Sequence, residues 1–513
     1  MHFVVIMAFA FVLSDNLPPA QFRWWDGTPV MGTVAWAMGQ VLGIAVVAWF
    51  MRRVAVARFD GSPAGHDRAL SALSRGHVVL LATIVSTLTA TMLFSPWAMI
   101  VREKWGLDRF PLVGDLLLLV PFFAALIAIW INQYPIEARL RWESVAPPDS
   151  PIAPPLHPSG DAASDEDRQV HGHRDAEGSL SAYLVDKFRH QVLIIAAPMI
   201  VIVFAKHFTD LWRPNITRRT GLPWLSDSIL ATISLCVLVC APVMLRYVWS
   251  TEPLACGPLR DRFVRTCRRI GLRYREILLW RTHGMAVNAA VMGFIPPLRY
   301  ILVSDALLEN MDEREIEAVF GHEAGHVHHW HLPFFGAFAA TSMYVSGGLV
   351  LLLDASNLVR DYGMLQFIGL AVLLVIWLFG FGWLSRRFER QADLFGVRCV
   401  TPDIETCTET CTVHGSAGRP HGLCLRAANL FGMTLIKIAN LNGIPRSAPS
   451  WRHGSIESRC RLIERLAADP AALRRFDRSL LAIKVVLGII FLIGSILGGV
   501  IYYPSVARAL GWQ

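Results

Sequence analysis

Charged residues are scarce in this chain of 513 residues. Asp, Glu, Lys and Arg together make up 17% of the sequence, whereas apolar residues account for 54%. The mean hydropathy is +0.43. A soluble chain of this length would form about two or three domains. The shortage of charge argues against that class and indicates a membrane protein.

Cysteine pairs with CxxC spacing are also missing, although the chain has nine cysteines. Their absence excludes the metal and redox motifs that depend on such pairs. No nucleic-acid motif accompanies the net charge of +8. The charge follows the positive-inside rule instead: basic residues gather in 52–75 and 249–332, whereas 354–364 has few. This pattern places 52–75, 249–332 and 385–479 in the cytoplasm and favours anionic lipid headgroups over nucleic acid as partners.

Long apolar runs are present in the number that a polytopic membrane protein needs. A helix requires about 20 residues to cross the hydrocarbon core. We expect about eight such helices, and hence a predominantly α-helical membrane protein. The expected spans are 30–51, 77–101, 112–131, 190–208, 228–248, 333–353, 365–384 and 480–502. For the shorter apolar run 1–13, an interfacial or partly inserted segment is favoured over a signal region, and cleavage stays open.

A polar stretch at 144–180, rich in proline, acidic residues, Ser and Gly, interrupts the apolar pattern. It cannot bury enough apolar surface to order itself, which predicts a flexible cytoplasmic linker. In chain order we expect an N-terminal segment (1–29), a first membrane block of three spans (30–131), the linker (132–188), two spans (189–248), a first catalytic part (249–332), a membrane hairpin (333–384), a second catalytic part (385–479) and a C-terminal span with its tail (480–513).

The stretch FGHEAGHVHHWHLPF, residues 320–334, contains five histidines. On a helix His322 and His326 lie one turn apart, so both imidazoles can reach one ion. Glu323 completes an HExxH pattern. In such a pattern two imidazoles hold Zn²⁺, and the glutamate takes a proton from the water in the open position. The sequence therefore predicts one catalytic zinc ion, with Glu323 as the base.

The helix that carries these residues has predicted ends. Asp312 with Glu315 forms a capping-box variant at its start, and Pro333 bounds its far end. On this helix His328 would point toward solvent or headgroups. His329 would lie about 10 Å along the axis from His322, too far to share the ion.

A third ligand is needed to complete the site. The metzincin pattern HExxHxxGxxH would require glycine and histidine where this chain has His329 and Leu332, so that class is excluded. The alternative is a carboxylate from a second helix. In SRRFERQAD, which directly follows the expected hairpin, Glu389 and Asp393 are one helical turn apart and face the same way. Glu389 can bind zinc, while Asp393 can accept a hydrogen bond from the other nitrogen of a ligand histidine.

A cysteine-rich insertion follows the second helix. Its spacings match no zinc pattern, so an inserted loop with unpaired thiols is favoured over a second, structural metal site. The residues concerned are Cys399, Cys407, Cys411, Cys424, His414 and His421.

Four motifs in this order carry a resemblance to a known family. They are VNAAVMGF, HEAGH, SRRFERQAD and WRHGSIESR. With them the chain resembles the gluzincin membrane proteases, which include the type I CAAX prenyl endopeptidase and the HtpX-like quality-control proteases. The resemblance covers residues 260–465 and implies a split cytoplasmic zinc protease domain with a small β element. The chain departs from the family at Gly454, where a proline is usual, and in its additional C-terminal span.

The resemblance also implies roles for further residues. Asn288 and Ala289, at the family's NAxxxG positions, would align an extended substrate along an edge strand. His453 and Arg459, at the spacing of its HPxxxxR motif, would stabilise the oxyanion or order the site. His331 coincides with a histidine of CAAX-type relatives, which implies a position on the substrate side.

The expected function is therefore that of an integral-membrane zinc endopeptidase acting on protein or peptide substrates at the cytoplasmic face. The alternatives are an inactive scaffold or chaperone, for which an intact HEAGH has no use, and a signalling protease that cleaves one regulatory partner. The substrate stays open between prenylated CAAX proteins and damaged membrane proteins or peptides. The excess of arginine over lysine favours a bacterial inner membrane. The oligomeric state is not predicted.

Overall fold

The structure is a computed structural model that divides into two compact units, Met1–His207 with Gly443–Pro445, and Phe208–Asn442 with Arg446–Gln513. Residues 1–28 of the expected N-terminal segment, 146–178 of the expected linker, and Cys411, His414 and His421 lie outside the described residues. The described residues are 29–59, 62–107, 110, 113–145, 179–222, 224–282, 287–355, 368–401, 407, 413 and 422–509.

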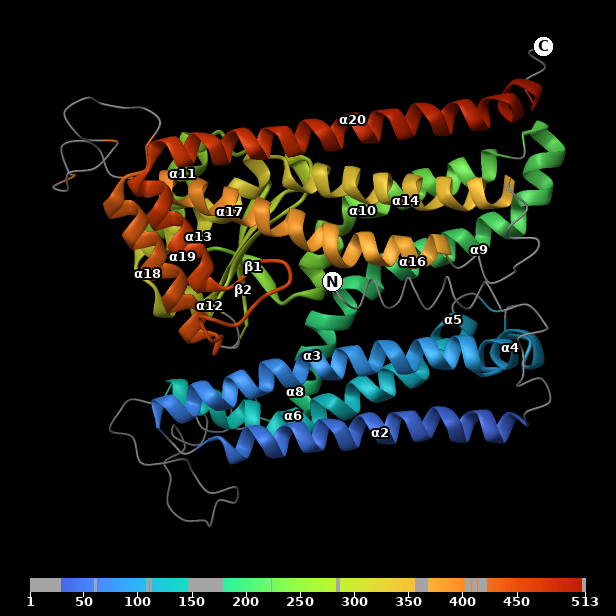
Figure 1. Ribbon diagram of the computed structural model, residues 1–513, viewed down its shortest axis with the longest axis horizontal. Coiled ribbons are helices and arrows are strands. Elements are labelled where there is room, and N and C mark those ends of the chain that lie inside the picture. The colour runs from blue at the N-terminus through green and yellow to red at the C-terminus, as the bar shows by residue number, and fades with distance from the viewer. Residues whose placement is uncertain are drawn as a thin grey trace. The chain divides into compact units, whose positions relative to one another are not determined.

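The first unit is built of helices. Its long helices are α2 (Val30–Ala57), α3 (Pro63–Phe94) and α6 (Val120–Val145), and α2 lies against both of the others (Figure 1). Small buried side chains, among them Ala55 and Ala69, occupy this contact and let the backbones approach closely. The shorter segments are α4 (Trp97–Met99), η2 (Ile100–Lys104), α5 (Val113–Leu118), α8 (Leu180–Lys187), η4 (Phe188–Leu193) and the start of α9 (Ile194–Thr220).

The second unit contains a four-stranded sheet in the order β1-β2-β4-β3. Its strands are β1 (Thr251–Pro253), β2 (Glu276–Trp280), β3 (Ala289–Met292) and β4 (Tyr300–Ser304). The central pair β2 and β4 is parallel, whereas the edge strands β1 and β3 pair antiparallel. Ile277, Ile301 and Val303 face helix α13 (Glu313–His328), where they bury Phe320 and Ala324. The helix that carries HEAGH thus packs against one face of the sheet.

The remaining helices of the second unit form two groups. Helices α17 (Gly382–Cys399), α18 (Leu425–Leu441) and α19 (Ile456–Ala468) gather near the sheet and share one core (Figure 1). Helices α14 (His331–Ala355) and α20 (Pro470–Ala509) extend away from it side by side. The other segments are α10 (Leu225–Val248), α11 (Pro258–Ile270), η5 (Pro296–Leu298), α12 (Asp305–Asn310), α16 (Ile368–Val375) and η7 (Ile376–Phe381).

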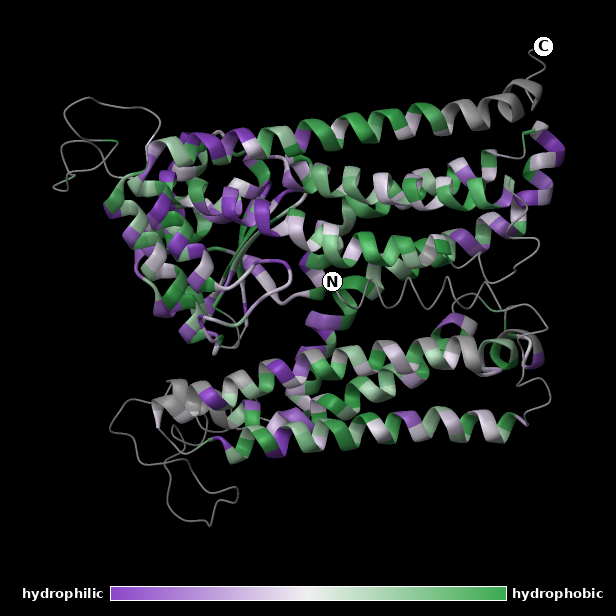
Figure 2. Ribbon diagram, viewed as in Figure 1, coloured by the Kyte–Doolittle hydropathy of each residue, from purple (hydrophilic) through white to green (hydrophobic). Residues whose placement is uncertain are grey.

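Six helices in the described part of the chain are long and apolar enough to cross a membrane. They are Val30–Ala57, Leu180–Thr220, Leu225–Val248, His331–Ala355, Ala371–Cys399 and Pro470–Gly498. Figure 2 shows the apolar lengths of α14 and α20 in contrast to the more polar helices near the sheet. The mainly helical membrane fold with a small sheet is confirmed. Of the eight expected spans, 77–101 and 112–131 are not among the six.

Two glycines set the distance between α13 and α17. A Cβ atom on Gly321 would lie 2.8 Å from Cys399 Cβ and 3.1 Å from Gly396 Cα. On Gly325 it would lie 3.0 Å from Phe395 Cβ and 3.1 Å from Ala392 Cα. Since these neighbours belong to or adjoin the backbone, they cannot rotate away. The absence of side chains here lets the two helices meet almost backbone to backbone.

We expect Gly321→Ala to destabilise the second unit. Overpacking costs about 1–3 kcal/mol, and the better helix propensity of alanine returns at most about 1 kcal/mol. The control is Gly432→Ala in α18, where the added methyl meets only Cys460 Sγ at 3.9 Å. Thermal unfolding in detergent should give a lower Tm for Gly321→Ala and an equal or higher Tm for Gly432→Ala. Equal Tm values for both variants would contradict the close contact.

Candidate metal centre

Helix α13 presents two histidines from successive turns. The predicted capping box is confirmed: the Asp312 carboxylate accepts from the backbone of Glu315, and the Glu315 carboxylate accepts from the backbone of Asp312. From this start the helix runs over the sheet and brings His322 and His326 to its α17 side. Their Nε2 atoms are 3.4 Å apart. Both rings therefore turn the same nitrogen toward one point.

Helix α17 adds a carboxylate to this pair. Glu389 Oε2 lies 3.5 Å from His322 Nε2, and Glu389 Oε1 lies 3.6 Å from His326 Nε2. Glu389 is buried, with 3% of its surface exposed. The structure thus brings together the three predicted ligands, although α13 and α17 are separated in the chain by the helices of the hairpin.

These three residues fit a tetrahedral metal ion. Bonds of about 2.0–2.2 Å to nitrogen and oxygen place the ligand atoms of a tetrahedral zinc about 3.3–3.6 Å apart. The two imidazole nitrogens lie 3.4 Å apart, and they lie 3.5 and 3.6 Å from the two oxygens of Glu389, so the three side chains are close enough together to hold one such ion. In the described part of the chain, His322, His326 and Glu389 are the one group of His, Cys, Asp and Glu side chains close enough to hold an ion. Three protein ligands leave a fourth position open.

The electrostatics of α13 also suit a cation. Burial disfavours a charged imidazole at His322, but the carboxylates of Asp393 and Glu389 outweigh burial and raise its pKa to about 10. The two carboxylates therefore favour positive charge at this position, and a metal ion bound at Nε2 would displace the proton of the ring. Burial, with the nearby His322, lowers the pKa of His326 to about 4, so this imidazole stays neutral, as a ligand must. Burial raises the pKa of the Glu323 carboxyl, against the opposing effect of His322.

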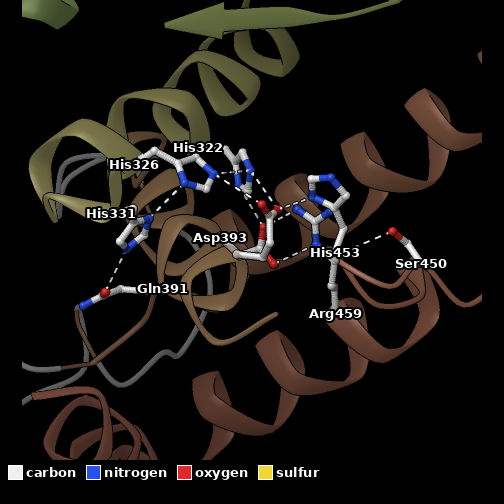
Figure 3. A network of polar contacts seen from close by, with 9 residues as sticks. His322, His326, His331, Gln391, Asp393, Ser450, His453 and Arg459 are labelled. Atoms are coloured by element: carbon white, nitrogen blue, oxygen red, sulfur yellow. Dashed lines mark hydrogen bonds and ion pairs between the residues drawn. The ribbon is translucent and has the colours of Figure 1, made fainter. Parts of the chain in front are cut away.

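Asp393 and Arg459 form a buried pair behind His322 (Figure 3). Asp393 Oδ1 lies 2.9 Å from His322 Nδ1, the ring nitrogen that does not face the pair of ligands. Arg459 donates from Nε to Asp393 Oδ2 at 2.9 Å and from Nη2 to Oδ1 at 2.5 Å. Such a bidentate contact fixes the carboxylate in one orientation. Arg459 thus reaches the site through Asp393.

His453 approaches the site from a loop before α19. Its Nδ1 lies 2.8 Å from Glu389 Oε2, and 45% of its side chain is exposed. Trp451 Nε1 donates to the carbonyl of Leu378 at 2.6 Å, which ties the loop to η7. Gly454 has φ +75° and donates its N–H to Ser450 O at 2.9 Å. A proline could provide neither, so this loop conformation requires a residue such as glycine at position 454.

His331 takes a position that differs from the expectation. The helix of the HEAGH motif ends at His328 rather than at Pro333, and Trp330 adopts φ +59°. This turn starts α14 at His331 and directs its ring back to His326, Nδ1 to Nδ1, at 2.9 Å (Figure 3). Only 1% of His331 is exposed. A substrate-side position is therefore wrong for this structure: the ring lies beneath a ligand histidine.

The remaining histidines of the tract lie outside the group of three ligands. His328 is exposed, as expected from the helical pattern, and its ring lies 4.6 Å from that of Phe395. The carbonyl of His329 accepts from Lys484 Nζ on α20 at 2.8 Å. This long-range contact holds the chain where the helix breaks.

Asn288 and Ala289 begin the edge strand β3. The Asn288 amide oxygen accepts from Ala289 N at 2.9 Å, and Asn288 N donates to Ser304 Oγ on β4. The preceding Val287 is held by Asn442, which accepts from its N–H and donates to its carbonyl. Asn442 is not among the residues predicted from the sequence. It lies at the end of α18 directly before a glycine, a pattern that is typical of a helix C-terminus.

The described cysteines lie away from the candidate metal centre. Cys399 is buried at the α13 contact, and Cys407 Sγ lies 3.8 Å from Cys424 Sγ. No described cysteine belongs to a group of three or more potential metal ligands. The other residues of the cysteine-rich insertion lie outside the described part.

Comparisons with known proteins find sequence similarity to proteases. Residues 259–458 match the model of Peptidase family M48. The chain is 28% identical to the "CAAX prenyl protease 1 homolog" of Arabidopsis thaliana over 195 residues, which are 35% of this chain and 46% of that protein. It is 30% identical to "Protease HtpX" of Xylella fastidiosa (strain 9a5c) over 149 residues, which are 26% of this chain and 50% of that protein.

The chain thus spans about half the length of the curated relatives it matches. The crystal structure of S. mikatae Ste24p is similar over 87% of this chain and 100% of its own, at 12% identity and a TM-score of 0.45, a value too low to bear on the site. The family match confirms the predicted resemblance. Residues 259–458 of this membrane protein are thus similar to Peptidase family M48.

Proposed function

We propose that this chain is a zinc-dependent endopeptidase, with His322, His326 and Glu389 as the metal ligands. The observation that carries the proposal is the meeting of three side chains from two helices: the two imidazole nitrogens lie 3.4 Å apart, and each lies within 3.6 Å of an oxygen of the Glu389 carboxylate. Two imidazoles and one carboxylate with an open fourth position are the donor set of catalytic zinc sites. Structural zinc sites are instead closed by four protein ligands.

The bound zinc would supply two effects, a lowered pKa of its water and a polarised substrate carbonyl. Glu323, next to His322 on α13, is the base that takes the proton and later delivers it to the leaving amine. The raised pKa of Glu323 helps the return of that proton, because the best pKa for a general acid and base lies near the working pH.

The neighbouring residues hold and complete this site. Asp393, fixed by Arg459, orients His322 so that Nε2 faces the ion. His453 is half exposed beside Glu389, and it would donate to the oxyanion that develops on the substrate carbonyl. Asn288 and Ala289 start β3 at the edge of the sheet, where an extended substrate can add as a further strand.

The substrate class follows from the membrane helices on both sides of the site. We assign protein or peptide substrates that are themselves associated with the membrane, as CAAX-type processing or quality control would provide. The positive-inside pattern favours the cytoplasmic face, and the excess of arginine favours a bacterial inner membrane. An inactive scaffold would need neither Glu323 nor the open metal position.

Replacing the base should separate chemistry from metal binding. Glu323→Gln keeps the size of the side chain but cannot accept the proton, so we expect cleavage of a casein or peptide substrate to fall about 10²–10⁴-fold. Zinc content, measured by atomic emission, should remain equal to that of the parent. Glu309→Gln on α12 is the matched control and should cleave normally. A purified Glu323→Gln that cleaves as fast as the parent would refute the mechanism.

Removing the metal should affect both activity and stability. A ligand at about 100 times its Kd stabilises the folded state by about 2.7 kcal/mol. We therefore expect 1,10-phenanthroline to abolish cleavage and to lower Tm, and zinc to restore both. The non-chelating 1,7-phenanthroline serves as the control. His326→Ala should show no shift of Tm on zinc addition, and an unchanged shift would exclude His326 as a ligand.

A further inference from the structure

The buried His331 has no part in the mechanism proposed above, yet it contacts a metal ligand. Its Nδ1 lies 2.9 Å from His326 Nδ1, and its Nε2 lies 3.0 Å from Gln391 Oε1 (Figure 3). The three side chains come from α13, α14 and α17. Together they form a continuous polar row that ends on the nitrogen of His326 opposite the candidate metal position.

The direction of the hydrogen bonds in this row is determined by its two ends. At one end, His326 directs Nε2 toward His322 and Glu389, so a neutral ring that binds metal there carries its proton on Nδ1. At the other end, the Gln391 amide oxygen can only accept. His331 Nε2–H therefore donates to Gln391, and His331 Nδ1 accepts from His326. Each ring is held in a single tautomer without any charged group.

The ring of His331 is also fixed in space. It stacks on Phe388 at 4.4 Å between centroids with an interplanar angle of 6°. Lys484 Nζ on α20 lies 5.3 Å from the centre of the Phe388 ring. The same group donates to the carbonyl of His329. The backbone turn at Trp330 is thereby stabilised, and this turn is what brings His331 under His326.

We propose that His331 is a positioning residue for the metal ligand His326, and that Gln391 selects the tautomer of His331 which does this. The inference rests on the metal site of the proposed function. It adds to that site a neutral counterpart of Asp393: one ligand histidine is oriented by a carboxylate, the other by a second imidazole.

The test measures zinc affinity of the full-length protein in detergent, by competition with a chromophoric chelator. His331→Phe keeps the stack on Phe388 but removes the acceptor, and such losses typically weaken metal binding about 10–100-fold. His331→Asn can place an amide oxygen near the position of Nδ1 and should restore much of the affinity. The control His328→Phe makes the same replacement at an exposed position and should bind zinc as the parent does.

A second pair of variants covers the case that His331→Phe disturbs folding. Gln391→Met removes the acceptor at the end of the row, and Gln391→Glu keeps one. We expect weaker zinc binding and an altered visible spectrum of the Co²⁺-loaded protein for Gln391→Met alone, with the Tm of the metal-free forms equal. A merely structural role would lower that Tm and leave the Co²⁺ spectrum unchanged.

The outcomes distinguish this inference from the function on which it rests. If the parent protein binds no zinc, the proposed function fails. If the parent binds zinc and both His331→Phe and Gln391→Met bind it equally well, the metal site stands and the positioning role is overturned. Graded loss in the order His331→Phe, His331→Asn and parent supports the role.

Discussion

The close contact of α13 with α17 is the constraint on which the rest of the site depends. Two ligands lie on one helix and the third on the other, and their ligand atoms must meet within the span of one small ion. Side chains between the helices would hold them apart. Gly321 and Gly325 remove those side chains on α13, and Gly396 and Ala392 present a correspondingly flat surface on α17. The sheet supports α13 from the opposite side through Phe320 and Ala324.

One of the two ligand helices, α17, is continuous with an apolar helix of the hairpin, whereas α13 is separated from α14 by the turn at Trp330. The sequence predicts a boundary between the membrane hairpin and the second catalytic part at residue 385. In the structure, the candidate span continues without interruption from Ala371 to Cys399. SRRFERQAD contains no proline or glycine that would end a helix, so the ligand Glu389 is rigidly attached to a membrane helix. The candidate ligand Glu389 and the membrane-length helix thus belong to one continuous element.

Local periodicity explains why the ligands could be predicted from the sequence. His322 and His326, like Glu389 and Asp393, are related by one helical turn, a spacing that the helix itself imposes. The break at Trp330 is favoured locally by Pro333, which has no N–H to donate to the carbonyl of His329 four residues earlier. That carbonyl accepts instead from Lys484, more than 150 residues further along. This distant contact helps to set the position of His331, and the residues of the histidine tract alone do not predict it.

Charge balance gives a physical reason for the unequal partners of the two ligand histidines. Glu323, Glu389 and Asp393 already place three carboxyl groups at the candidate metal position, and the buried Arg459 pairs with Asp393. A further buried carboxylate behind His326 would bear a desolvation cost of its own. The neutral imidazole of His331, which donates to the amide of Gln391, orients the ring of His326 and adds no charge. The same contact that fixes geometry therefore also keeps the net charge of the site close to what one divalent cation can neutralise.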